Sequence, residues 1–184
     1  MTPRAARGIV GRVTIHDEHP FATPAGERDQ LRRFRGRLAV PVSLWTARAG
    51  EERPAGLTVS SMLVALGEPG SVLGLLDPDS DLFEALEASG RVVVNVLGWE
   101  HRQLADAMAH LAPAPGGPFR MATWTDTAWG PVLDTAVAWL GARLVGEPEE
   151  VGRSMLVRCE VETVTVTEGA PLSFLQGRYR RVDG

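Results

Sequence analysis

The amino-acid sequence predicts a mainly β fold, an antiparallel β-barrel that carries short helices. Most apolar segments are short β-branched runs or alternate apolar with polar residues, and only a few short stretches show helical spacing. Strands and helices do not alternate regularly, as they would in a doubly wound sheet. No repeat or linker divides the 184 residues, a length that suits one domain with a substantial core. We interpret residues 1–26, rich in Gly, Pro, Arg and His, as a flexible arm and residues 27–184 as the domain.

The first part of the domain is expected to hold one short helix and three strands. Residues 27–37 predict a helix that Gly36 ends. Strands are expected over 38–47, 55–66 and 71–77, which are rich in Val, Leu, Trp and Thr. Pro41 favours an edge position or a bulge for the first of them, because Pro has no N–H for a ladder. The turn residues of 49–54 suit a hairpin between the first two strands.

The second part predicts two helices and five strands. Asp79 or Ser80 can cap a helix that ends at Gly90. Its residues Leu82, Phe83 and Leu86 are expected to face the core. Residues 101–111 repeat apolar side chains at helical spacing, and a loop rich in Pro and Gly follows. Strands are expected over 91–98, 121–125, 132–144, 155–166 and 172–175.

The composition excludes several classes of protein. The net charge of −4 argues against nucleic acid or a membrane surface as a partner. The single cysteine, Cys159, cannot form an intramolecular disulfide and is interpreted as a small buried residue in a strand. Neither a signal-peptide core nor a membrane span is present in the sequence. A soluble, cytoplasmic protein is therefore expected.

Several well-known site motifs are missing from the sequence. It holds no G-x-G-x-x-G after a strand, no P-loop and no G-x-S-x-G elbow. The stretch His16 to His19 is interpreted as solvated rather than as a metal site. His101 and His110 fall on different helix faces, so no metal centre is predicted.

The region from Arg37 to Val182 resembles the flavin reductase-like family in five blocks, which follow one another in the family's order. The strongest is RPAGLTVSS at 53–61, very close to the family's x-P-x-G-M-T-V-S-S. The others are GRLAVPVSLWTA, LLDPDSDLFEALEASGRVVVNVL, HRQLADAMA and GAPLSFLQGRYRRV. The resemblance implies a split β-barrel of Greek-key type that binds FMN or FAD and works as a homodimer. It also implies an oxidoreductase that uses NADH or NADPH to reduce flavin, which it supplies to a monooxygenase.

The resemblance also implies a set of cofactor-binding residues. The strongest block would run along the isoalloxazine and ribityl chain and contributes Gly56, Thr58, Val59, Ser60 and Ser61. Its small side chains, hydroxyls and close backbone suit a flat ring edged with polar atoms.

The phosphate end of the flavin is assigned to Asp77 and Ser80. Ser80 would stand at a helix start, which favours a phosphate, although it can equally serve only as the helix cap. Asp77, Asp79 and Asp81 would repel a phosphate unless they point outward. Arg178, or an arginine of the second subunit, would then supply positive charge.

Asn95 is the last candidate. Its side chain either contacts the flavin or the partner subunit, or satisfies backbone groups at a bulge. The tryptophans are interpreted as core or dimer-contact residues rather than as platforms for the flavin ring.

Two departures from the family pattern favour an alternative function. Gly152-Arg153-Ser154 stands where many members have Gly-Asp-His, and Leu175 stands where many have His. The alternative is a module that binds flavin, deazaflavin or haem without reductase activity. Because hydride transfer to flavin mainly needs stacked rings, the missing histidines do not forbid reduction, and no catalytic acid or base is assigned.

Overall fold

The computed structural model describes residues 30–182. The chain divides into two units, Met1–Arg35 and Gly36–Gly184, and each is described by itself. Of the first unit, the described part is the helix α1 (Gln30–Arg35), which lies within the predicted 27–37 and ends just before Gly36. The predicted arm, residues 1–26, lies outside the described residues.

The second unit is mainly β, as predicted. Its strands are β1 (Val40–Pro41), β2 (Ser43–Ala47), β3 (Ala55–Val59), β4 (Met62–Ala65), β5 (Ser71–Leu76), β6 (Arg91–Val96), β7 (Trp124–Thr127), β8 (Gly130–Leu133), β9 (Ala138–Leu144), β10 (Glu149–Val151), β11 (Ser154–Val166), β12 (Leu172–Leu175) and β13 (Arg178–Arg181). Its helices are α2 (Asp81–Ser89) and α3 (Arg102–Met108), with short 3-10 turns η1 (Trp99–His101) and η2 (Pro118–Met121). Among these helices, none is both long and apolar enough to cross a membrane.

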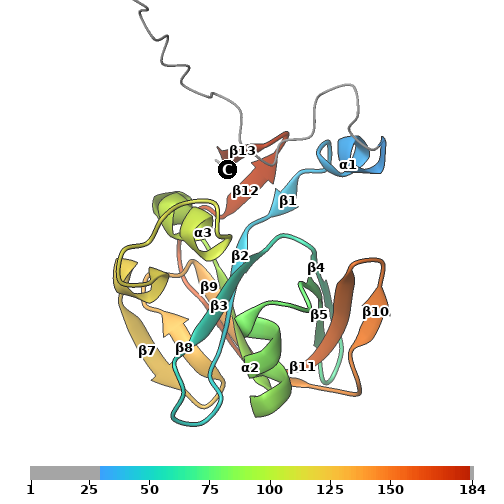
Figure 1. Cartoon of the computed structure of the whole chain (residues 1–184), viewed down its shortest axis with the longest axis vertical. Coiled ribbons are helices and arrows are strands. Elements are labelled where there is room, and N and C mark those ends of the chain that lie inside the picture. The colour runs from blue at the N-terminus through green and yellow to red at the C-terminus, as the bar shows by residue number, and fades with distance from the viewer. Residues whose placement is uncertain (1–29, 183–184) are drawn as a thin grey trace, which may run out of the picture. The chain divides into compact units, whose positions relative to one another are not determined.

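One antiparallel sheet of eight strands forms the body of this unit. Its order is β3-β2-β6-β9-β11-β5-β4, with β10 added on β11. The first and last strands of this path, β3 and β4, are separated in the chain by only Ser60 and Ser61. The sheet therefore has to curl until its two ends approach each other, which Figure 1 shows. This curl confirms the prediction of a barrel-like antiparallel fold with short helices.

Trp45 fills the interior of the curled sheet. Its side chain is fully buried, and it starts on β2 and reaches Gly74 on β5, which is not a neighbouring strand. A Cβ atom at Gly74 would lie only 2.6 Å from Cη2 of Trp45. Gly74 is therefore needed so that the indole ring can cross the interior. Around it lies a core that includes Cys159, whose pKa burial raises to about 12, as expected for a thiol inside a strand.

A second core lies beneath α3 and the smaller sheets. The strands β1, β12 and β13 form a three-stranded sheet, and β7 pairs with β8 (Figure 1). Apolar side chains from these parts meet in one cluster: Val42, Leu44, Leu97, Leu104, Met108, Leu133 and Leu172. This core holds the C-terminal strands and α3 against one end of the main sheet.

Asn95 joins the β7–β8 hairpin to the main sheet. Its side chain is fully buried, and its amide donates to the Leu44 carbonyl at 3.1 Å and to the Thr46 hydroxyl at 3.3 Å. Its carbonyl oxygen accepts the N–H of Leu133 at 2.9 Å. The strand pairing is regular at this position, so the expected bulge is wrong. Asn95 therefore satisfies backbone groups of β2 and β8 inside the core.

Several predicted strands are interrupted in the structure. The run 38–47 divides at Val42, so that β1, with Pro41, pairs with β12 at the edge of the small sheet. The run 55–66 divides at Ser60 and Ser61, where the chain leaves one end of the main sheet for the other. The run 132–144 divides where Ala136 donates to the Leu133 carbonyl in a turn. Composition cannot locate such breaks, because the residues on both sides are equally β-like.

Candidate functional site

The fold brings two of the predicted site segments together. The Leu75 N–H donates to the Ser61 carbonyl at 3.0 Å, and Asp77 follows Leu75 after one residue. The connection Ser60–Ser61 therefore lies beside the turn that leads into α2. These segments are far apart in the chain but share the place where the curled sheet turns from β3 to β4.

Ser80 begins α2 as its N-cap. Its backbone is extended, with φ −84° and ψ 140°, and its hydroxyl oxygen accepts the Phe83 N–H at 3.2 Å. The same hydroxyl donates to the Asp77 carbonyl at 2.7 Å, while the Asp77 carboxylate accepts the Asp79 N–H at 3.0 Å. Ser80 is thus the N-cap of α2, one of the two roles predicted for it. A cap of this kind leaves the helix dipole directed at whatever lies before the helix.

The outward face of β3 is covered along half of the predicted block. At Gly56, a Cβ would lie 2.9 Å from the Met108 sulfur and 3.2 Å from the Phe119 ring. The Thr58 hydroxyl donates to the Ala105 carbonyl at 2.8 Å. Gly56 is therefore where α3 and η2 approach β3 most closely.

The other residues of the block differ in exposure. Val59 is 3% exposed and belongs to the interior core, and its carbonyl accepts the Ser43 hydroxyl at 2.7 Å. Ser60 and Ser61 continue past the part of β3 that α3 covers, and both are half-buried. Of the predicted block, these two serines are the best placed to meet a ligand.

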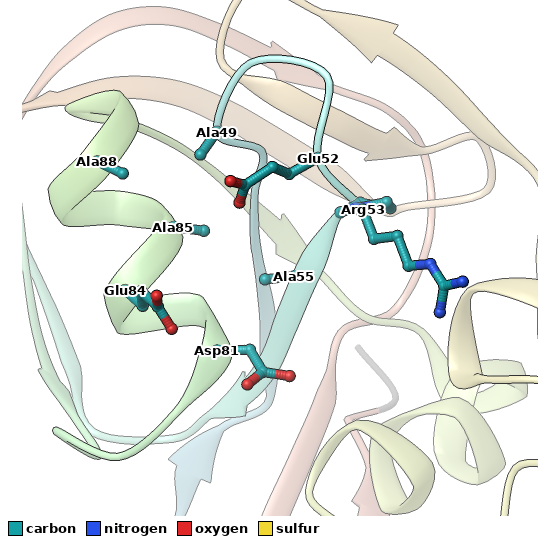
Figure 2. Close-up of a pocket in the computed structure, with 9 residues that line it drawn as sticks. Ala49, Glu52, Arg53, Ala55, Asp81, Glu84, Ala85 and Ala88 are labelled. Carbon is teal, nitrogen blue, oxygen red and sulfur yellow. The ribbon is translucent and has the colours of Figure 1, made fainter.

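A pocket of about 280 Å³ lies between α2 and the loop that joins β2 to β3. Its wall carries three carboxylates, Glu52, Asp81 and Glu84, and one guanidinium, Arg53. Figure 2 shows Glu52 reaching from the loop toward α2, whereas the Arg53 side chain extends away from that helix. The negative excess of this wall disfavours a phosphate inside the pocket.

Arg178 is not brought to Ser80 by the folding of one chain. It is the exposed first residue of β13, paired with Leu175, and Figure 1 shows β13 and α2 at opposite ends of the view. Within residues 30–182, no hydrogen bond or salt bridge joins Arg178 to the other candidates. The turn Gly152-Arg153-Ser154 connects β10 to β11, with Arg153 exposed.

His101 is a residue of this region whose structural role the sequence pattern did not reveal. Its ring is 6% exposed; Nδ1 accepts the Gly98 N–H at 2.9 Å, and Nε2 lies 2.9 Å from the Thr135 hydroxyl. Burial lowers its pKa from 6.5, and the Glu100 carboxylate, 3.9 Å away, opposes that shift. Helical spacing alone cannot distinguish such a histidine from a solvent-exposed one.

The state of His101 leads to a prediction about pH. The pKa of His101 is lower in the folded chain than its value of 6.5 in the unfolded chain. The neutral ring therefore contributes its full stabilisation above pH 6.5, and this stabilisation is lost as the pH falls below 6.5. Urea denaturation between about pH 7.5 and pH 5 should therefore show a larger loss of stability for the natural chain than for His101→Gln. Equal losses in both chains would contradict this role of the histidine.

Comparison with known proteins identifies the family. The sequence model of the family described as "Flavin reductase like domain" matches residues 35–183. The FMN reductase (NADH) RutF 1 of Methylorubrum extorquens is 30% identical over 166 residues, which are 89% of this chain and 81% of that protein. The reductase component of 4-hydroxyphenylacetate 3-monooxygenase from Pseudomonas aeruginosa is 27% identical over 148 residues, 79% of this chain and 86% of that protein. The structure of the NADH:FAD oxidoreductase SgcE6 of Streptomyces globisporus matches with a TM-score of 0.75 at 26% identity, covering 88% of this chain and 96% of that one. The chain belongs to the flavin reductase like domain family.

Proposed function

We propose that this protein is a flavin reductase that oxidises NADH or NADPH, reduces FMN or FAD, and passes the reduced flavin to a separate monooxygenase. The observation that carries the proposal is the meeting of Ser60–Ser61 with the Asp77–Ser80 turn in a chain of this family. The relatives named above support the reaction, since one is an FMN reductase and another is the reductase component of a monooxygenase.

The donors at this place suit a flavin. Ser60 and Ser61 offer hydroxyl and backbone groups for the polar edge of the ring and the ribityl chain. The nine-residue helix α2 directs its positive dipole end at the space before Ser80, which suits the phosphate. The carboxylates of Asp77, Asp79 and Asp81 oppose that charge, so the site needs a cation from outside this turn. We assign that role to Arg178 of a second copy of the chain, because within one chain Arg178 lies away from α2.

The protein's part in the reaction is to bind and orient. A bound flavin would supply the acceptor for the hydride of the nicotinamide. The serines would hold the polar edge of the ring, and the curled sheet beneath them would keep the ring in one orientation. Because close stacking of the two rings is the main requirement, no protein acid or base is needed.

The test is a visible absorption spectrum of the purified protein with added FMN or FAD, before and after NADH or NADPH without oxygen. We expect the flavin to bind and its visible absorption band to bleach with at least one nucleotide. A protein that takes up neither flavin would overturn the proposal.

A second candidate function is flavin binding without reduction. Two observations favour it: Leu175 is a half-buried apolar residue in β12, and Arg153 is an exposed turn residue, where many family members carry histidines. In that case the bound flavin would keep its spectrum with both nucleotides. The same experiment therefore separates the two functions.

Ser80 offers a sharper prediction about the phosphate. Ser80→Ala removes the cap and should cost about 1 kcal/mol of stability. Ser80→Asp keeps a capping oxygen but adds a negative charge, so it should preserve stability while weakening flavin affinity by roughly tenfold or more. Glu87→Asp, a change on the same helix away from its start, is the control for flavin affinity measured by titration. An unchanged affinity in Ser80→Asp would exclude this position as the phosphate site.

We also propose that the protein is a homodimer. Exposed apolar side chains gather along β4 and its turn, where Leu63 is 73% and Leu66 is 97% exposed. The Val161 N–H donates to the Gly70 carbonyl at 2.9 Å, so this turn lies against the middle of β11, the strand that carries the exposed Val164 and Val166 further along. Contiguous exposed apolar residues of this kind mark association surfaces. Light scattering should give twice the chain mass, and Leu63→Glu with Leu66→Glu should give the monomer mass.

A further inference from the structure

The turn that follows β6 holds an exposed aromatic ring beneath a guanidinium. Trp99 is 37% exposed, and the Arg102 guanidinium lies 3.8 Å from the centre of its ring and also donates to the Trp99 carbonyl. The turn is held firmly from below by the two hydrogen bonds of the buried His101. Trp99 and Arg102 therefore form a preorganised platform at the surface.

Strand register places this platform and the proposed flavin site at the same end of the main sheet. Ser43 on β2 pairs with Val59 on β3 and with Val96 on β6. The chain thus leaves β3 at Ser60 and leaves β6 at Leu97 on the same end of the sheet, two strand spacings or about 10 Å apart. In addition, Ala105, one helical turn after Arg102, accepts the Thr58 hydroxyl. Trp99 and Arg102 therefore lie on the segment that follows β6, at the end of the sheet where the chain also leaves β3 for the serines.

The chemistry of the platform suits a nucleotide. A planar guanidinium stacked on an indole offers a flat cationic face for a base, and its N–H edges match phosphate oxygens. Within residues 30–182, Arg102 forms no salt bridge; the Glu100 carboxylate lies 3.9 Å from His101 Nδ1, and the Asp106 carboxylate, one turn after Arg102 on α3, accepts the Tyr179 hydroxyl. The proposed phosphate of the flavin lies at Ser80, so this cation is available to a second nucleotide.

We propose that Trp99 and Arg102 bind the adenosine diphosphate half of a dinucleotide, the NADH or NADPH of the proposed reaction. This inference rests on the proposed function for the identity of the dinucleotide. The site itself can be tested with ADP alone, which contains neither flavin nor nicotinamide.

The experiment compares the natural chain with Arg102→Gln and Trp99→Leu. With FMN as the flavin, which lacks adenosine, both variants should raise the KM for the nicotinamide nucleotide by roughly tenfold or more. The kcat and the affinity for FMN should change less than twofold, a separation that a merely unfolded variant would not show. The matched control is Arg91→Gln, because Arg91 also donates to a backbone carbonyl, that of Ala128, but stands at the opposite end of β6.

Calorimetric titration with ADP gives a readout that does not depend on turnover. Binding to the natural chain that is lost in Arg102→Gln supports the site even if the protein reduces no flavin. If the natural chain reduces flavin but KM and ADP binding are the same in both chains, the inference is overturned and the proposed function stands. If only the KM for FAD rises, and not that for the nicotinamide nucleotide, the adenosine diphosphate belongs to FAD and the assignment to NADH or NADPH is overturned.

Discussion

Replacing Trp45 with alanine is expected to lower the free energy of unfolding by about 3–5 kcal/mol. The indole is fully buried, crosses the interior of the curled sheet and donates from Nε1 to the Ser43 hydroxyl at 3.1 Å. Truncation to alanine would therefore leave a cavity inside the sheet. Urea denaturation followed by circular dichroism measures the change, and a loss below about 1 kcal/mol would contradict the interior role of the ring.

A double-mutant cycle with Gly74 tests the same contact from the other side. Gly74→Ala puts a methyl group where the ring already lies and should cost about 1–3 kcal/mol. In a Trp45→Phe background the smaller ring leaves room, so the same substitution should cost clearly less. Gly70→Ala serves as control, because a Cβ there would meet its nearest atom at an ordinary 3.5 Å. Additive costs would show that the two residues do not interact.

Replacing Asn95 with leucine is expected to cost about 2–4 kcal/mol. Leucine has nearly the same size but forms none of the hydrogen bonds that Asn95 makes to Leu44, Thr46 and Leu133. The Leu133 N–H would then be buried without its partner, and the β7–β8 hairpin would lose its attachment to β6. Chemical denaturation measures the loss of stability.

Thr46→Val is the matched comparison for Asn95. It removes the hydrogen bond from the Thr46 hydroxyl to the Pro131 carbonyl at 2.6 Å and one of the two acceptors of the Asn95 amide, and keeps the others. Its cost should therefore be smaller than that of Asn95→Leu. If both variants are as stable as the natural chain, the buried network does not hold the hairpin.

The class of fold, most of the elements and the family can be predicted from local patterns in the sequence. β-branched runs, helix caps and turn residues act locally, so they identify α2, β5, β6 and β12 close to their observed bounds. The block at 53–61 likewise led to the family, because it preserves residue order over a long stretch. By contrast, the charged strands β10 and β13 were not predicted, since their stability comes from pairing with β11 and β12 rather than from an apolar pattern of their own.

Which candidate residues lie close together, by contrast, depends on how distant segments of the chain pack. Gly56 and Asn95 carry the same local signals as Ser60 and Ser80, yet the first is covered by Met108 and Phe119 and the second is buried in a hydrogen-bond network. Trp99 and Arg102 have no distinctive pattern in the sequence, and only the pairing of β3 and β6 with β2 brings their segment and the serines to the same end of the sheet. Local patterns record a residue's preference for a backbone conformation, whereas burial and proximity depend on contacts between distant segments.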